Sequence, residues 1–292
     1  MPTIRESIIQ RLESMTSLPS LSRTVQQVQE QLSRGEDSLS GAATIGAIIE
    51  KDLGLSAKVL KIANSVFYSG RFGRIGDVKQ AVARLGIEEV GRICTTVGSM
   101  QLFKETSGLI DIKDFWKHSV GVAIVMRYLS QRVDMNKSKA HNAYVAGLFH
   151  DVGIMVLDGF FTEIYKKVRE AGKSNQMMLY KLEREVLGID HGQIGAMLLL
   201  RWRLPEELCD AVAWHHAPDE CPEEFRHMAQ LIHVANFACS ALGIAEPGDE
   251  IIQTASDGAW HDLNLDSSDL NKIAEEVEEG IAQSGVFVSL SL

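Results

Sequence analysis

Long hydrophobic runs are missing from this sequence. No window approaches the roughly eighteen consecutive apolar residues that a membrane-spanning helix needs, and the N-terminal stretch MPTIRESIIQRLESM mixes charges into a helical pattern. A secretory signal peptide would instead place an uninterrupted apolar core there. We therefore expect a cytoplasmic protein that does not associate with a membrane.

Cysteine is also scarce. The four cysteines, Cys94, Cys209, Cys221 and Cys239, are widely spaced and form no C-x-x-C pair. Disulfide-stapled domains and thiolate zinc sites both rely on patterned cysteines. The sequence argues against both, and we expect reduced, mostly buried thiols.

Alternating apolar and polar residues, the pattern of a half-buried strand, are nearly absent. Apolar residues recur instead at helical spacing, as in the stretch GDVKQAVARLG over residues 76–86. Serines precede and glycines follow such stretches, as helix caps do: Ser22, Ser56, Gly86, Gly188 and Gly243. The sequence therefore predicts an all-α fold of many helices.

Basic residues are nearly absent from the end of the chain. Residues 245–292 contain eleven acidic residues and one base, Lys272, so this segment carries the whole formal net charge of −10. The remaining body is neutral and has little electrostatic attraction for a phosphate backbone, so we expect no direct nucleic-acid binding. Within the segment, residues 269–283 (DLNKIAEEVEEGIAQ) are typical of an amphipathic helix.

Histidine divides the chain, because none of the nine histidines precedes His118 and eight lie between His118 and His233. This distribution predicts an N-terminal helical lobe over residues 1–106 without obvious chemistry. It predicts a second lobe over residues 107–244 that carries the site. Residues 245–292 form an acidic C-terminal extension. The oligomeric state is left open.

Six residues form the candidate site, and each lies inside or beside an apolar helical stretch: His118, His150, Asp151, His191, His215 and His216. A lone histidine on an apolar face is more often a hydrogen-bonded core residue, and His-Asp dipeptides also arise by chance. Several buried imidazoles and a carboxylate, however, are costly unless they pair or bind a metal. The joint pattern favours a pocket for one or two ions of iron, manganese, zinc or nickel.

The order of these motifs resembles a known family, the HD superfamily of metal-dependent phosphohydrolases, and within it the HDOD branch of signalling output domains, which is related to HD-GYP. In the first lobe the likeness rests on LPSLSRTVQQV, KDLGLSAKVLKIANS and IGDVKQAVARLGIEEV. In the second it rests on FWKHS, AGLFHDVG, LLLRWRLPEEL and WHHAP. The resemblance covers the chain to about residue 243. It implies a multi-helical HD-domain-like bundle with an additional N-terminal helical lobe.

Carried over residue by residue, the resemblance makes His118 the first metal ligand and His150-Asp151 the HD pair, which would be catalytic only if the protein is active. His191, His215 and His216 then correspond to the extra imidazoles of two-metal HD variants.

Two positions depart from the active family members. The closing aspartate corresponds to Asn236, a neutral amide and a poorer ligand than a carboxylate. Active HD-GYP enzymes carry a lysine where this chain has Ile154, and the GYP signature is absent.

Further candidates surround these residues. Asp114 lies one helical turn before His118 and either adds a carboxylate to the site or is a solvated first-turn acid. Glu185 is expected to support the site or to remain solvated. His233 is expected to pack between helices, and His141, His227 and His261 to lie at the surface.

Two functions follow. The first is a signalling or regulatory module with a metal-binding pocket and little or no hydrolysis, whose partner is a signalling protein or a small phosphorylated ligand. The alternative is a metal-dependent phosphohydrolase, a phosphodiesterase acting on nucleotides or cyclic dinucleotides. Asn236 and Ile154 favour the first, and the six ligand-type residues favour the second.

Overall fold

The computed structural model describes residues 2–34, 39–69, 74–103, 109–175, 177–244 and 255–291. Within these ranges all regular structure is helical, which confirms the predicted fold class. The first group of helices comprises α1 (Ile4–Ser14), α2 (Arg23–Ser33), α3 (Leu39–Glu50), α4 (Leu53–Ala63), α5 (Val66–Ser69), α6 (Val78–Leu85) and α7 (Ile87–Met100). The second comprises α8 (Ile112–Arg132), α9 (Lys137–Phe149), α10 (Val152–Phe160), α11 (Thr162–Asn175), α12 (Leu179–Leu187), α13 (His191–Arg201), α14 (Glu206–Trp214), the 3₁₀ turn η1 (Pro218–Glu220), α15 (Glu223–Ala241), α16 (Asp257–Asp262) and α17 (Ser267–Ser291).

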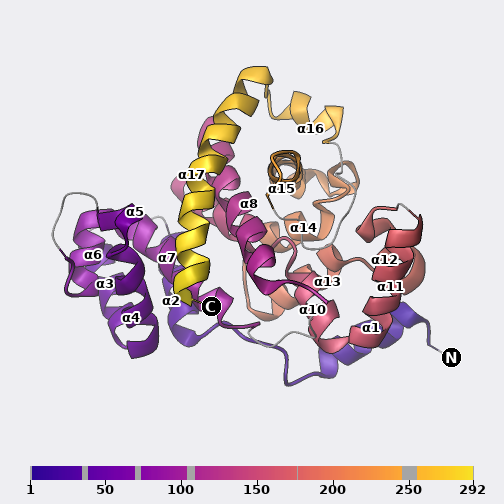
Figure 1. The fold of residues 1–292 in the computed structure, drawn as a ribbon, viewed down its shortest axis with the longest axis horizontal. Helices are drawn as coiled ribbons and strands as arrows, with labels where there is room; N and C mark the ends of the chain where they lie inside the picture. The colour runs from indigo at the N-terminus through magenta and orange to yellow at the C-terminus, as the bar shows by residue number, and fades with distance from the viewer. Residues whose placement is uncertain are drawn as a thin grey trace.

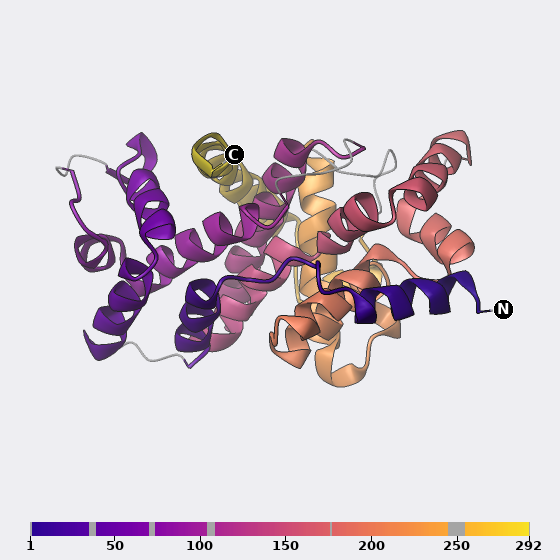
Figure 2. The same ribbon diagram turned by 90° about the horizontal axis from the view of Figure 1, so that it is seen from below.

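Helices α8 and α9 form the centre of the molecule. Figures 1 and 2 show α2–α7 at one end and α10–α14 at the other, with α8 running between them. The two central helices cross closely because Gly147 of α9 has no side chain: a Cβ there would lie 2.9 Å from the Cα of Ala123 in α8. Apolar residues of α8 such as Val122 and Met126 are fully buried, so the core continues through this crossing.

Helix α1 packs on the second half of the chain, although its residues come first. The guanidinium of Arg11 lies 5.1 Å from the ring centre of Phe161, and Arg201 Nη1 donates a hydrogen bond of 3.2 Å to the carbonyl oxygen of Leu12. The indole of Trp202 then donates to the carbonyl of Pro19 at 2.8 Å. These contacts fix the extended segment that leads into α2. The division of the chain at 106 and 244 stays a prediction.

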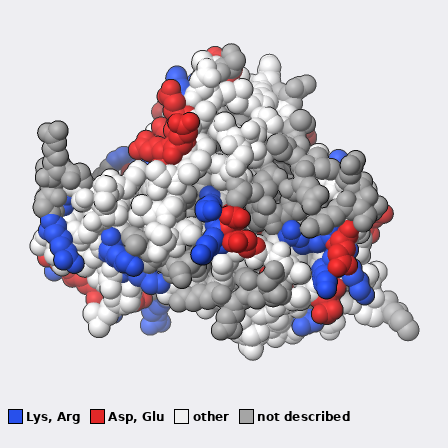
Figure 3. Space-filling model, viewed as in Figure 1, with Lys and Arg blue, Asp and Glu red and all other residues white. Residues whose placement is uncertain are grey.

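The last helix, α17, extends the predicted 269–283 helix in both directions and packs along α8 while contacting α4, α5 and α7. Its buried face carries Ile273, Val277 and Phe287. Exposed acidic residues of α17, Glu275, Glu278 and Glu279, lie on the opposite side, where Figure 3 shows carboxylates gathered on the upper part of α17. The acidic helix is therefore amphipathic and docked. Residues 245–254, also part of the predicted extension, lie outside the described residues.

Helix ends follow the predicted caps with one exception. Ser22 caps α2, and Gly86, Gly188 and Gly243 all adopt positive φ angles at helix ends. The predicted start at Ser56 is wrong, because the side chain of Asp52 accepts a hydrogen bond from the Leu55 backbone and starts α4 four residues earlier.

All four cysteines are free and buried, as predicted. One described segment, Lys137–Phe160, is long and apolar enough to cross a membrane by composition alone. It comprises α9 and α10, and 89% of its most apolar window is buried inside the fold, as in a core helix.

Candidate metal centre

The His150-Asp151 pair lies at the junction of α9 and α10. His150 caps the C-terminus of α9, and Asp151 is the residue before α10. Two positions later, Gly153 allows α10 to approach α13, because a Cβ at this position would lie 1.9 Å from the carbonyl oxygen of His191. A glycine is therefore required where the helix bearing Asp151 meets the helix that begins with His191.

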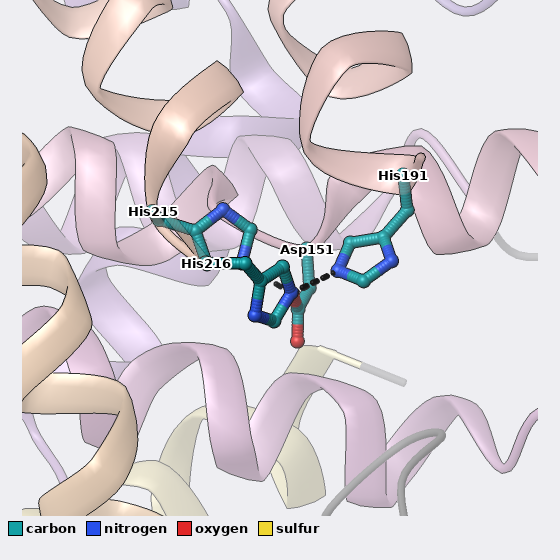
Figure 4. Close-up of side chains that lie close together, drawn as sticks. All are labelled: Asp151, His191, His215 and His216. Carbon is teal, nitrogen blue, oxygen red and sulfur yellow. Dashed lines mark hydrogen bonds and ion pairs between the residues drawn. The ribbon is translucent and has the colours of Figure 1, made fainter. Parts of the chain in front are cut away.

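The carboxylate of Asp151 lies at the centre of the cluster. Its Oδ2 is 3.1 Å from His150 Nε2 and 3.8 Å from His118 Nε2. Its Oδ1 is 3.3 Å from His191 Nε2 and 3.6 Å from His215 Nε2. Figure 4 shows His191 and His215 on opposite sides of Asp151. Four helical elements thus direct imidazole nitrogens at one buried carboxylate.

His216 completes the cluster from the end of α14. Its Nε2 lies 2.8 Å from His191 Nε2, and its ring stacks on Tyr180 at 4.4 Å with an angle of 3° between the planes. All six predicted site residues are buried, and they form two groups that share Asp151. In each group the ligand-type atoms lie within 4.8 Å of one another: His118, His150 and Asp151 (the HD group), and Asp151, His191, His215 and His216 (the histidine-rich group).

Two imidazoles have the orientation that metal ligands require. Nδ1 of His150 donates to the carbonyl of Gly147 at 2.8 Å, and Nδ1 of His215 donates to the carbonyl of Val212 at 2.7 Å. Their Nε2 atoms face Asp151, are buried and have no hydrogen-bond partner. Ligating histidines are fixed in this way through the opposite nitrogen, and an unsatisfied buried nitrogen is otherwise costly. These residues therefore fit a cation.

His118 has the reverse arrangement. Its Nε2 is 3.0 Å from Oδ1 of Asn236, and its buried Nδ1 has no hydrogen-bond partner. The family position of the closing aspartate is thus beside His118, as the sequence predicts, but it holds an amide that already contacts the nitrogen facing the cluster.

His191 is supported by a carboxylate that the sequence analysis missed. Glu183 Oε2 accepts from Nδ1 of His191 at 2.7 Å and from its backbone N–H at 2.8 Å, and the residue is fully buried. Glu185, the predicted candidate, is exposed. Its position in the helix could have identified Glu183 as a buried residue from the sequence. It lies four residues after Leu179 and four before Leu187, both on the buried face of α12.

The electrostatics concentrate negative charge on Asp151. Burial alone would raise its pKa, but the imidazoles of His150, His191 and His215 outweigh this and hold the pKa well below its ordinary value. Burial lowers the pKa of His118 to about 4. For His191 the effect of burial is outweighed by the carboxylates of Glu183 and Asp151, which raise its pKa. The cluster thus presents an anionic oxygen among imidazoles at neutral pH.

The remaining candidates lie elsewhere. The side chain of Asp114 is half exposed and its Oδ1 lies 3.0 Å from Lys117 Nζ, so it is a surface acid of the first turn of α8. His227 and His261 are exposed, as predicted.

The prediction for His141 is wrong. It is buried and its Nε2 donates to Gln29 Oε1 at 2.6 Å. His233 is buried, as expected of a packing residue, and its Nδ1 donates to the carbonyl of His215 at 2.8 Å. It thereby also holds the end of α14 in place.

The structure is a helical bundle around a buried cluster of histidines and an aspartate. This is the architecture that the sequence resemblance predicts. The family model of the HDOD domain matches residues 18–218, and the chain belongs to this family. Among curated sequences it is 25% identical over 248 residues to an uncharacterised protein of Treponema pallidum (strain Nichols), a match that covers 84% of this chain and 46% of that protein. The chain spans less than half the length of the curated relatives it matches.

Two solved structures share the fold. An HDOD domain protein of unknown function from Geobacter sulfurreducens superposes with a TM-score of 0.81 at 22% identity, covering 99% of this chain and 97% of the other. A candidate phosphohydrolase from Shewanella amazonensis SB2B gives a TM-score of 0.73 at 20% identity, with 98% of each chain covered. At these identities the likeness establishes the fold alone.

Proposed function

We propose that this protein is a cytoplasmic HDOD signalling module whose buried cluster binds a divalent transition metal, with little or no hydrolysis. The observation that carries the metal site is the pair of buried Nε2 atoms of His150 and His215, which face Asp151 without hydrogen-bond partners. Imidazole and carboxylate ligands together suit iron, manganese, zinc or nickel. When bound, such an ion would polarise phosphate oxygens and lower the pKa of water.

The surroundings of His118 favour the regulatory role over hydrolysis. Hydrolysis across a pair of ions needs two complete sets of ligands. In this chain Asn236 supplies a neutral oxygen in place of a carboxylate, at 3.0 Å from His118. Ile154, which replaces the lysine of active HD-GYP enzymes, is buried and offers no charge for a phosphate.

The partner in this proposal is a signalling protein or a small phosphorylated ligand. The helices α2–α7 form one end of the molecule, away from the cluster-bearing helices α10, α13 and α14 (Figure 2). This separation leaves that end available for a protein contact while the cluster binds metal.

Metal content and thermal stability test the proposal. Untagged protein purified without chelator is expected to contain stoichiometric metal, and chelation should lower the melting temperature. At a free metal concentration one hundred times the Kd, the lost stability is about 2.7 kcal/mol. Asp151→Asn should abolish metal binding, whereas Asp114→Asn, which alters a surface carboxylate on α8, should not. Protein without metal, unaffected by chelation, would rule the proposal out.

The alternative, a phosphohydrolase, is favoured by the six clustered ligand-type residues. An aryl phosphodiester and cyclic dinucleotides distinguish the two functions in the same preparations. The regulatory proposal predicts no turnover by the metal-loaded protein. Turnover that Asp151→Asn abolishes and Asp114→Asn retains would instead establish a phosphodiesterase.

A further inference from the structure

The two ligand groups of the cluster differ in whether their nitrogens are engaged by a residue outside the group. In the HD group, His118 Nε2 lies 3.0 Å from the amide of Asn236. If the amide oxygen faces the ring, Nε2 carries a proton and has no lone pair to offer. If the amide is flipped, its NH₂ donates to that lone pair. In either orientation an ion must displace a hydrogen bond to gain this ligand, which leaves His150 and Asp151 as the ready members.

The histidine-rich group has no such competitor for His215. The Nδ1 of His215 is used by the Val212 carbonyl, so its Nε2 carries the lone pair. His191 and His216 share a hydrogen bond between their Nε2 atoms at 2.8 Å, and a single ion bound to both nitrogens would replace this contact between two ligands. Three imidazoles and one carboxylate match the ligand number of a four-coordinate site. Among the described residues, only this group brings four ligand-type side chains together.

Glu183 adds an independent argument for the same group. It is fully buried, its Oε1 has no hydrogen-bond partner among the described residues, and its Oε2 accepts from both the ring and the backbone of His191. The neighbouring Arg184 pairs instead with Asp190 at 2.5 Å. A buried carboxylate is costly unless positive charge compensates it. An ion on the far nitrogen of the His191 ring supplies that charge in place of a ring proton, and Glu183 holds the remaining proton on Nδ1 so that Nε2 faces the ion.

We propose that the chain holds a single transition-metal ion, in the histidine-rich group, and that Glu183 is the positioning residue that tightens its binding through His191. The HD group, limited by the contact between His118 and Asn236, takes no second ion. This inference rests on the proposed metal-binding function and specifies its stoichiometry and its ligands.

Metal titration of matched variants tests which group binds. Full-length protein freed of metal by chelation and dialysis is titrated separately with Zn²⁺, Mn²⁺ and, without oxygen, Fe²⁺. The wild type should bind one ion per chain. His118→Ala and His215→Ala each remove one imidazole that faces Asp151. His118→Ala should keep the ion with its Kd changed less than about threefold, and His215→Ala should lose it.

Two further variants test the limits of the site without removing a ligand. Asn236→Asp places a carboxylate beside His118 and should allow a second ion to bind. Glu183→Gln keeps the size and the acceptor oxygen but removes the charge, and should raise the Kd of the first ion by about 10- to 100-fold. Glu185→Gln, an exposed position on the same helix, is the control and should leave the Kd unchanged. Melting temperatures of the metal-free variants separate this effect from a loss of folding.

The outcomes separate this inference from the function on which it rests. If the wild type binds none of the three ions, the proposed function itself fails. If it binds two ions, or one that His118→Ala abolishes and His215→Ala retains, metal binding stands but the assignment to the histidine-rich group is overturned. A Glu183→Gln variant with the Kd of Glu185→Gln would remove the positioning role.

Discussion

The buried histidines of this chain differ in their hydrogen-bond partners. His141 is a buried histidine that lies away from the cluster. Its Nε2 donates to Gln29 Oε1, Gln29 donates to Thr95 Oγ1, and Thr95 donates to the carbonyl of Gly91 at 2.9 Å. The direction of this chain of hydrogen bonds fixes His141 as a donor without requiring a charge. Helices α9, α2 and α7 are thus joined by one satisfied polar network.

We therefore expect His141 to make the free energy of unfolding decrease as the pH is lowered. Burial lowers its pKa to about 3 in the folded protein, against about 6.5 when unfolded. Between these values the unfolded chain binds more protons, so the contribution is full above pH 6.5 and is lost as the pH falls toward 3. Between pH 7 and 5 the wild type should lose about 2 kcal/mol more of its free energy of unfolding than His141→Gln. Urea denaturation of metal-free protein measures this difference.

The control for this measurement is His261→Gln, which alters an exposed histidine and should follow the wild-type pH dependence. A His141→Gln variant that loses as much stability as the wild type between pH 7 and 5 would show that His141 is not the buried neutral group described above.

The six site residues could be identified from the sequence because histidine and aspartate are common metal ligands. The residues that hold them in place could not be identified in this way. His150 and Asp151 are recognisable as a pair because they are adjacent in the sequence. Glu183 is not, because the segment KLEREVL has the charges of a solvated helix and only the packing of α12 shows which acid is buried. His141 was misplaced for the same reason: its partner Gln29 is distant in the sequence.

At the scale of elements, the site depends on the crossing of α10 and α13. Gly153 lies two residues after Asp151. It faces the first turn of α13 so closely that a Cβ would lie 2.7 Å from the His191 carbonyl carbon and 2.8 Å from the Gly195 nitrogen. Both are backbone atoms, which cannot move aside as a flexible side chain can. The position of His191 relative to Asp151 is therefore set by a missing side chain.

Gly153→Ala should separate the two helices. The expected cost is about 3 kcal/mol or more in the free energy of unfolding, since overpacking against backbone cannot be relieved by a rotamer change. Metal binding should weaken with it because His191 moves away from Asp151. Gly159→Ala, at the other end of α10, meets open space and should be neutral or stabilising by up to about 1 kcal/mol. Thermal unfolding and metal titration of both variants test this, and equal behaviour of the two would contradict it.

Element ends show what local sequence can and cannot predict. Ser22 was identified correctly because it directly precedes the apolar periodic residues of α2. Ser56 was chosen wrongly because Asp52 and Ser56 both satisfy the capping pattern, and only the hydrogen bond from Leu55 to Asp52 decides between them. The last helix continues to Ser291, beyond the charged stretch that marked it, and tertiary packing on α4, α5, α7 and α8 stabilises it.

At the scale of the whole molecule, α17 joins the central helix α8 to α4, α5 and α7 at one end of the molecule. Near its start, Asp269 accepts a hydrogen bond of 3.0 Å from Arg132 Nε at the end of α8. Near its end, the amide of Gln283 contacts Tyr68 and lies 3.2 Å from Glu89 Oε1, on α5 and α7. Sequence analysis predicted the helix but not its docking, since the apolar face that it covers is assembled from distant segments.

Loosening α17 should therefore weaken α8 and the α2–α7 end of the molecule together. Phe287 is 1% exposed, and its replacement by alanine should cost about 3–5 kcal/mol. Leu270, on the same helix but 40% exposed, should cost about 1 kcal/mol or less. Hydrogen exchange should show Phe287→Ala lowering protection in α2–α7 and in α8 alike, because one helix supports both. Protection lost in α8 alone, with α2–α7 unchanged, would mean that α8 and the α2–α7 end unfold separately and that α17 stabilises only α8.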